Sequence, residues 1–146
     1  MGLMVVVCGS PMGRLYECSD SIWADNPGIV GITQPRRVAA VSMAARVGQE
    51  LSLPTSKLSY QIRYDATTAP TTSIKFMTDG VLLREMATDF LLSKYSVIIV
   101  DEAHERSLNT DILIGTLSRV IKIREKLWLE GRPEVKVGSF GLKVAC

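Results

Sequence analysis

The chain has 146 residues, of which 47% are apolar and 22% charged, as is typical of one folded domain. A net charge of +2 is too small to indicate nucleic-acid binding by bulk charge, so such binding must come from local clusters of Arg and Lys. The three cysteines form no CxxC pair, and the single histidine cannot complete a zinc site with them. No apolar stretch is long enough to span a membrane. We therefore expect neither a zinc site nor a membrane segment.

Apolar runs rich in β-branched residues alternate along the chain with segments of helical periodicity. Buried strands are predicted over residues 3–9, 28–34, 73–78 and 96–101, with a further strand over residues 58–64. Helices are predicted over residues 36–51 and 79–92 and from Asn109 onward. The first of these helices has apolar residues on neighbouring faces and should be covered on more than one side. The alternation predicts an α/β fold with a mostly parallel sheet and right-handed crossovers.

Two acids, Asp101 and Glu102, follow directly on the strand predicted over residues 96–101. In a parallel sheet, ligands bind beyond the carboxyl ends of the strands. In one interpretation this is a Walker B element, in which Asp101 holds Mg²⁺ through water and Glu102 orients and deprotonates the water that attacks the γ-phosphate of ATP. In the other, two acids close a strand and cap the next turn. From the strand and the acids alone, the two interpretations weigh equally.

Three motifs in order resemble those of the DEAH-box RNA helicases. DEAHERS at residues 101–107 resembles the family signature, GITQPRRVAAVSMAARV at residues 31–47 its motif Ia, and FMTDGVLLREM at residues 76–86 its motif Ib. The resemblance covers about residues 28–126 and implies the first RecA-like domain of a P-loop NTPase. Residues 107–128 are most similar to the nucleolar branch of the family that assembles ribosomes, which implies pre-ribosomal proteins as possible partners and a location in the nucleus or nucleolus.

The resemblance implies that the backbone of single-stranded RNA is bound by residues of the first two motifs, namely Thr33, Arg36, Arg37, Thr78, Asp79 and Gly80. A hydroxyl group and two guanidinium groups at a strand-to-helix junction suit phosphate oxygens. Paired arginines at the positive end of a helix are otherwise unfavourable unless an anion lies nearby. The alternatives stay open: the two arginines are a solvated helix start, and Asp79 is a plain N-cap.

The resemblance also implies ATP and Mg²⁺ as cofactors. Asp101 and Glu102 would bind the metal and the nucleotide, and Glu102 and His104 would be catalytic. His104 would link the nucleotide site to a Ser-Ala-Thr segment in the family's next strand; alternatively, it is a structural histidine. Three residues, Ser107, Asn109 and Asp111, are expected to be turn or helix-cap residues and not catalysts. A solvated basic face is expected at Arg119, Lys122, Arg124 and Lys126.

The strand over residues 3–9 should be followed by a phosphate loop, GxxxxGK and then Ser or Thr, whose backbone N–H groups bind phosphate. The segment found there, GSPMGRL, has its second glycine one residue too early, Arg14 in place of Lys, and Leu15 in place of the hydroxyl residue. Pro11 removes one N–H donor. We therefore expect residues 1–146 to be a partial RecA-like domain without the loop around residues 9–16, and with a tail over about residues 136–146 that departs from the family.

Three hypotheses follow. The chain represents part of an ATP-dependent RNA helicase that couples ATP hydrolysis to RNA or RNP remodelling, although the chain itself is expected to be catalytically inactive. Alternatively, it is a truncated, non-catalytic fragment that binds RNA or a partner. In the third, it is an unstable splice product or an inaccurate gene model, because a missing crossover helix would leave one face of the sheet uncovered.

Overall fold

The computed structural model describes residues 3–7, 28–52, 54, 56–67, 69–131 and 141–144. The strands within these ranges are β1 (Met4–Val7), β2 (Ile29–Gln34), β3 (Leu58–Ile62), β4 (Asp65–Ala66), β5 (Ile74–Thr78), β6 (Tyr95–Val100) and β7 (Gly141–Val144). The helices are α2 (Arg37–Glu50), α3 (Asp79–Thr88) and α4 (Leu108–Leu129), with a short 3₁₀ helix η1 (Ala103–Glu105). None of the helices in these ranges is long and apolar enough to cross a membrane.

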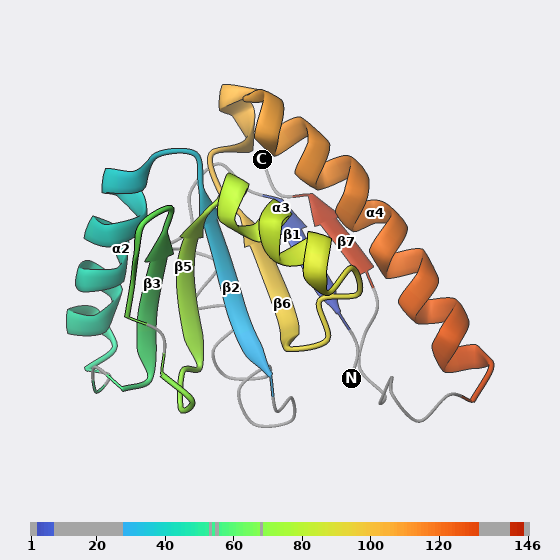
Figure 1. Ribbon diagram of the computed structural model, residues 1–146, viewed down its shortest axis with the longest axis horizontal. Coiled ribbons are helices and arrows are strands. Elements are labelled where there is room, and N and C mark those ends of the chain that lie inside the picture. Colours follow the sequence, from blue (N-terminus) through green and yellow to red (C-terminus); the bar gives the residue numbers. More distant parts are fainter. Residues whose placement is uncertain are drawn as a thin grey trace.

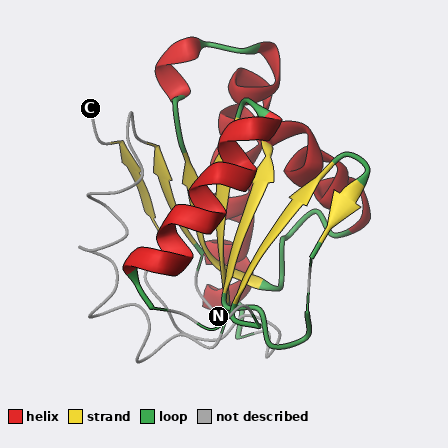
Figure 2. Ribbon diagram, turned by 90° about the vertical axis from the view of Figure 1, so that its left-hand side faces the viewer, coloured by secondary structure: helices red, strands yellow, loops and turns green. Residues whose placement is uncertain are grey.

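The strands form one sheet in the order β4-β3-β5-β2-β6-β1-β7, in which only the short β4 is antiparallel to its neighbour. Helix α2 covers one face, and α3 and α4 cover the other (Figures 1 and 2). The predicted α/β fold with a mostly parallel sheet is confirmed. The carboxyl ends of β2, β5 and β6 meet at one edge, and each leads directly into a segment that resembles a helicase motif.

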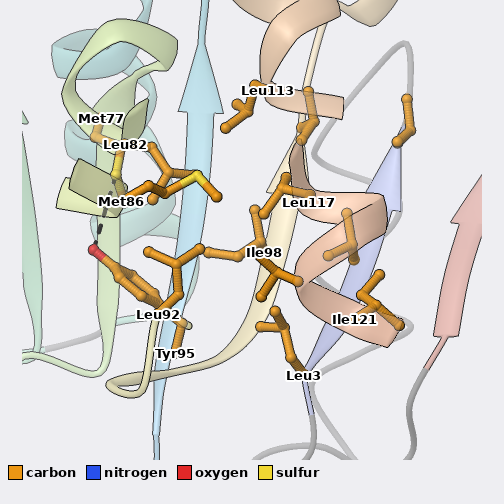
Figure 3. Close-up of a cluster of buried hydrophobic side chains, with 14 of the residues drawn as sticks. Leu3, Met77, Leu82, Met86, Leu92, Tyr95, Ile98, Leu113, Leu117 and Ile121 are labelled. Carbon is orange, nitrogen blue, oxygen red and sulfur yellow. Dashed lines mark hydrogen bonds between the residues drawn. The ribbon is translucent and has the colours of Figure 1, made fainter. Parts of the chain in front are cut away.

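The larger core lies between the sheet and helices α3 and α4. It includes Leu82 and Met86 of α3, Leu113 and Leu117 of α4, and Ile98 of β6, all buried (Figure 3). A second core, which includes Ile32, Phe76 and Ile99, lies under α2. Because both faces of the central strands are covered, β6 is apolar at nearly every position, which is the pattern from which its strand was predicted.

Helix α2 is buried on one side only within the described residues. Ala40, Ala44 and Val47 face the sheet, whereas Val38 is 80% exposed and Ala45 is also exposed. The prediction that this helix is covered on more than one side was therefore wrong. Single apolar side chains that face water, such as Val38, are ordinary on the surface of a folded protein and need no covering layer.

Helix α3 ends at Thr88, four residues before the predicted end. Asp89 follows it, and one oxygen of its carboxylate accepts hydrogen bonds from the backbone N–H and the hydroxyl of Ser93, at 2.7 and 2.6 Å. These bonds favour a turn over a further helical turn. As a result, Leu92 adopts a left-handed conformation and is buried, whereas Phe90 is 44% exposed.

Arg124 does not lie on a solvated basic face, contrary to the prediction. It is 3% exposed, and its Nη1 donates hydrogen bonds to the carbonyl oxygens of Leu91 and Leu92, both at 3.0 Å, and of Tyr95, at 3.4 Å. Burial lowers the pKa of Arg124, while the carboxylate of Asp89 opposes that shift. The side chain thus fastens the loop between α3 and β6 to helix α4.

Candidate functional site

The first part of the candidate site is an acidic turn, residues 101–105, at the carboxyl end of β6. Asp101 is only 1% exposed. One of its carboxylate oxygens, Oδ2, accepts a hydrogen bond from Nε2 of Gln34, and its backbone N–H donates to the carbonyl oxygen of Thr33 at 3.2 Å. The end of β2 therefore holds Asp101 through both backbone and side chain.

Glu102 has a left-handed backbone conformation, with φ of 52°. For a residue with a side chain this costs on the order of 1–2 kcal/mol, and such strain is concentrated at functional sites. Its carboxylate oxygen Oε2 lies 3.3 Å from Nε2 of His104, and the imidazole of His104 is largely exposed. The turn thus presents Glu102 and His104 side by side, beside the buried Asp101.

The described residues contain no group of three or more His, Cys, Asp or Glu side chains placed to hold a metal ion. Mg²⁺, however, is usually held by one or two carboxylates together with water and substrate phosphates. The carboxylates of Asp101 and Glu102 line one pocket of about 410 Å³. Their donor set therefore fits a Mg²⁺ ion that a bound nucleotide shares.

Arg36 and Arg37, which are adjacent in sequence, lie in different pockets. Arg36 lines the pocket of the acidic turn and pairs through Nη2 with Oε1 of Glu105 at 2.8 Å. This acid provides the anion that an arginine at a helix start requires. Arg37 lines a second pocket and has no acidic partner in the described part of the chain.

This second pocket, of about 270 Å³, is the arginine pocket; it is lined by Pro35, Arg37, Arg63, Thr78, Asp79, Gly80, Val81, Arg84, Ser107 and Asn109. Its three guanidinium groups come from the start of α2, from the turn after β3 and from the middle of α3. The N-terminus of α3, which has no side-chain cap, opens into the same pocket. Guanidinium groups and a helix N-terminus both favour bound anions.

The structure brings together four of the six residues predicted to bind RNA: Arg37, Thr78, Asp79 and Gly80. Thr33 is 0% exposed, and its hydroxyl has no hydrogen-bond partner among the residues that the structure describes, so its side chain cannot reach a ligand in this conformation. Asp79 is nearly as buried, and its Oδ2 accepts a hydrogen bond from the hydroxyl of Thr110 at 2.6 Å. Asp79 is the first residue of α3 and not its N-cap, which is Thr78.

Arg63 and Arg84 line the arginine pocket and were not among the predicted site residues. Arg63 lies between β3 and β4, and its guanidinium stands 5.1 Å from the ring centre of Tyr64, which is 81% exposed. In the sequence, an arginine followed by a tyrosine at the end of a predicted strand could have indicated this part of the pocket. Arg84 gave no such signal, because an exposed arginine in an amphipathic helix is ordinary.

The segment over residues 9–16, where the phosphate loop was expected to be missing, lies outside the described residues. Most of the tail over residues 136–146 does so as well. Its residues 141–144 form β7, which pairs in parallel with β1. Downstream of the acidic turn, Ser107 caps α4 by accepting a hydrogen bond from the N–H of Thr110 at 3.1 Å, as predicted. Asn109 and Asp111, for which the same role was predicted, lie within the first turn of α4 instead.

No protein-family model matches the chain. "Probable ATP-dependent RNA helicase DHR1" of Saccharomyces cerevisiae is 64% identical over 145 residues, which cover 91% of this chain and 11% of that protein. "ATP-dependent RNA helicase DEAH13" of Arabidopsis thaliana is 56% identical over 128 residues, 86% of this chain and 10% of the relative. "Probable ATP-dependent RNA helicase DHX37" of Homo sapiens is 50% identical over 131 residues, 84% of this chain and 11% of the relative.

The chain thus spans only 10–11% of the length of these relatives. Within that span, however, the similarity includes the acidic turn and all of the segments that line the arginine pocket. Together with the parallel sheet that carries them, it shows that the chain belongs to the family of DEAH-box ATP-dependent RNA helicases.

Proposed function

We propose that this chain carries part of the RNA-binding and nucleotide-binding surface of an ATP-dependent RNA helicase. The observation that supports the proposal is that acidic and basic side chains lie in two separate pockets at one edge of the sheet. The arginine pocket lies on the side of α3 and α4, and the acidic turn lies beside α2, with the end of β2 between them.

The arginine pocket is the proposed contact for the backbone of single-stranded RNA. Arg37, Arg63 and Arg84 supply guanidinium groups that suit phosphate oxygens, and Gly80 leaves the backbone at the start of α3 open to close approach. Within the described part of the chain, a Cβ at Gly80 would meet only the side-chain nitrogen Nδ2 of Asn109, at 3.7 Å. Because these groups recognise phosphate and not bases, the binding should depend little on RNA sequence.

The acidic turn is the proposed nucleotide side of the same surface. Asp101 and Glu102 would hold the Mg²⁺ of a bound ATP, and the metal would neutralise charge on the phosphates. Glu102 would orient and deprotonate the attacking water, and His104, beside Glu102, would transmit the state of the nucleotide to the rest of the protein. The ion pair between Arg36 and Glu105 steadies this turn, so we assign Arg36 to it and not to RNA.

The chain by itself is proposed to be inactive as an ATPase, because residues 9–15 lack the lysine and the hydroxyl residue of a phosphate loop. Charge-assisted contacts to the β- and γ-phosphates are each worth roughly 1.5–3 kcal/mol. Their loss would leave Asp101 and Glu102 without a positioned nucleotide. Steady-state ATP turnover that disappears on Glu102→Gln would contradict this proposal.

The similarity of residues 107–128 to the nucleolar branch of the family implies a role in ribosome biogenesis. We therefore propose pre-ribosomal RNA and its proteins as the substrate, and the nucleus or nucleolus as the location. Co-sedimentation of the tagged protein with pre-ribosomal particles is the test. A protein confined to fractions free of such particles would refute this assignment while leaving the RNA pocket in place.

The RNA pocket is tested by titrating the chain with a fluorescent oligouridylate over a series of salt concentrations. Arg37→Ala should weaken binding about tenfold or more, because one charge-assisted contact is lost. It should also reduce the slope of log affinity against log salt by about 0.7, the value for one phosphate of a single strand.

Arg119→Ala is the matched control, because Arg119 is an exposed arginine on α4 outside both pockets. Arg36→Ala should have a smaller effect than Arg37→Ala, since Arg36 pairs with Glu105. Circular dichroism would confirm that each variant is folded. If Arg37→Ala binds RNA as Arg119→Ala does, the arginine pocket is not the RNA site.

A further inference from the structure

Gln34, the last residue of β2, is a buried polar side chain that the proposed function leaves without a role. It is 2% exposed and lines the pocket of the acidic turn. Its Nε2 donates a hydrogen bond to Oδ2 of Asp101, 67 residues away along the chain. Hydrogen bonds from an amide to an ionised carboxylate are stronger than those between neutral groups.

The hydrogen bond from Gln34 restricts the rotation of the Asp101 carboxylate. The terminal torsion of an aspartate side chain is broad and roughly two-fold, so the carboxylate is not fixed by its rotamer alone. The backbone of Asp101 is already tied to β2 through the carbonyl oxygen of Thr33. With the backbone fixed, the hydrogen bond from Gln34 selects the rotation of the carboxylate, and the burial of both residues keeps water from replacing it.

We propose that Gln34 is a positioning residue for Asp101: its side-chain amide sets the orientation in which the Asp101 carboxylate receives a divalent cation at the acidic turn. The inference rests on the proposed role of Asp101 as a Mg²⁺ ligand. Carboxylates that bind metals are in general oriented by hydrogen bonds from a second layer of residues, and loss of such a partner typically costs about 10–100-fold in metal affinity.

Gln34 also joins the two pockets. It belongs to the short segment from β2 to α2 that places Arg36 against Glu105 and Arg37 in the arginine pocket. A change in the path of this segment would therefore move the hydrogen-bond donor of Asp101. The side-chain amide of Gln34 thus connects the segment that carries Arg37 directly to the carboxylate of Asp101.

The experiment measures Mn²⁺ binding to the whole chain by the loss of the free-ion signal in electron paramagnetic resonance, without nucleotide. Asp101→Asn should abolish binding. Gln34→Leu, which keeps the size of the side chain but removes the donor, should weaken binding about 10–100-fold. Gln49→Leu on the exposed side of α2 is the control, because Gln49 lies outside the pocket of the acidic turn.

Thermal unfolding followed by circular dichroism would separate positioning from a loss of structure. If Gln34→Leu does not fold, Gln34→Asn is used, since its amide is retained but is one methylene too short to keep the bond. A folded Gln34 variant that binds Mn²⁺ as tightly as the native chain overturns the inference and leaves the proposed function standing. Native binding that is absent, or unchanged in Asp101→Asn, refutes the metal role of Asp101 itself and the inference with it.

Discussion

Replacing Arg124 by methionine should destabilise the protein by about 2–4 kcal/mol. The guanidinium donates to two carbonyl oxygens of the loop between α3 and β6, those of Leu91 and Leu92, and to that of Tyr95 at the start of β6. A hydrogen bond from a charged group contributes about 1.5–3 kcal/mol, but all three bonds come from the single Nη1 atom, so the loss corresponds to one or two full bonds. Methionine nearly fills the same volume, which keeps a large cavity from adding to the cost.

Urea unfolding of the native chain and the variant, followed by circular dichroism at 222 nm, gives the difference in free energy of unfolding. Arg119→Met is the matched control: Arg119 lies on the same helix but is exposed, and its replacement should change stability by no more than about 0.5 kcal/mol. Equal stabilities of the two variants would refute the reasoning, because Arg124 would then behave as the surface residue that its sequence suggested.

Three further outcomes are expected. Ser107→Ala should lower the free energy of unfolding by about 1 kcal/mol in urea, since the N–H of Thr110 loses its acceptor at the start of α4. Burial raises the pKa of Asp89, but hydrogen bonds from Ser93 outweigh this effect and lower the pKa overall. The stability that the Asp89 carboxylate provides is therefore present above about pH 4 and is lost as the pH falls further. Asp89→Asn should remove this loss of stability at low pH. Gly31→Val should cost about 1–3 kcal/mol in thermal unfolding, because even a Cβ there would lie 2.9 Å from side-chain carbons of Ile98 and Tyr95.

The strands and the acidic turn were predictable because both depend on local patterns. A strand covered on both faces needs a run of apolar residues, and β6 is buried at every position. The chain leaves such a strand where polar residues begin, so Asp101 and Glu102 had to lie at the edge of the sheet. The predicted end of α3 was too late because periodicity continued past Thr88, while a side-chain hydrogen bond from Ser93 to Asp89 favoured a turn.

The positions of the arginines were not predictable in the same way. Arg36 and Arg37 are neighbours of the same type, and their separation depends on the backbone. Arg36 is extended, with φ of −112° and ψ of 137°, and Arg37 begins the helix. The change in direction sends one side chain to Glu105 and the other to the arginine pocket, where it lies near arginines of two other elements.

The sequence by itself determined the class of fold, the edge of the sheet where ligands would bind and the family to which the chain belongs. It could do so because apolar periodicity and contiguous motifs are properties of short stretches. Only the tertiary structure decided that Thr33 is buried, that Arg124 supports a loop, that Arg36 pairs with an acid, and that Gln34 holds Asp101. Each of these features depends on a partner at least 29 residues away or on a neighbouring strand. The burial and the pairing of a residue are set by the residues that pack against it, and the sequence alone does not state which residues those are.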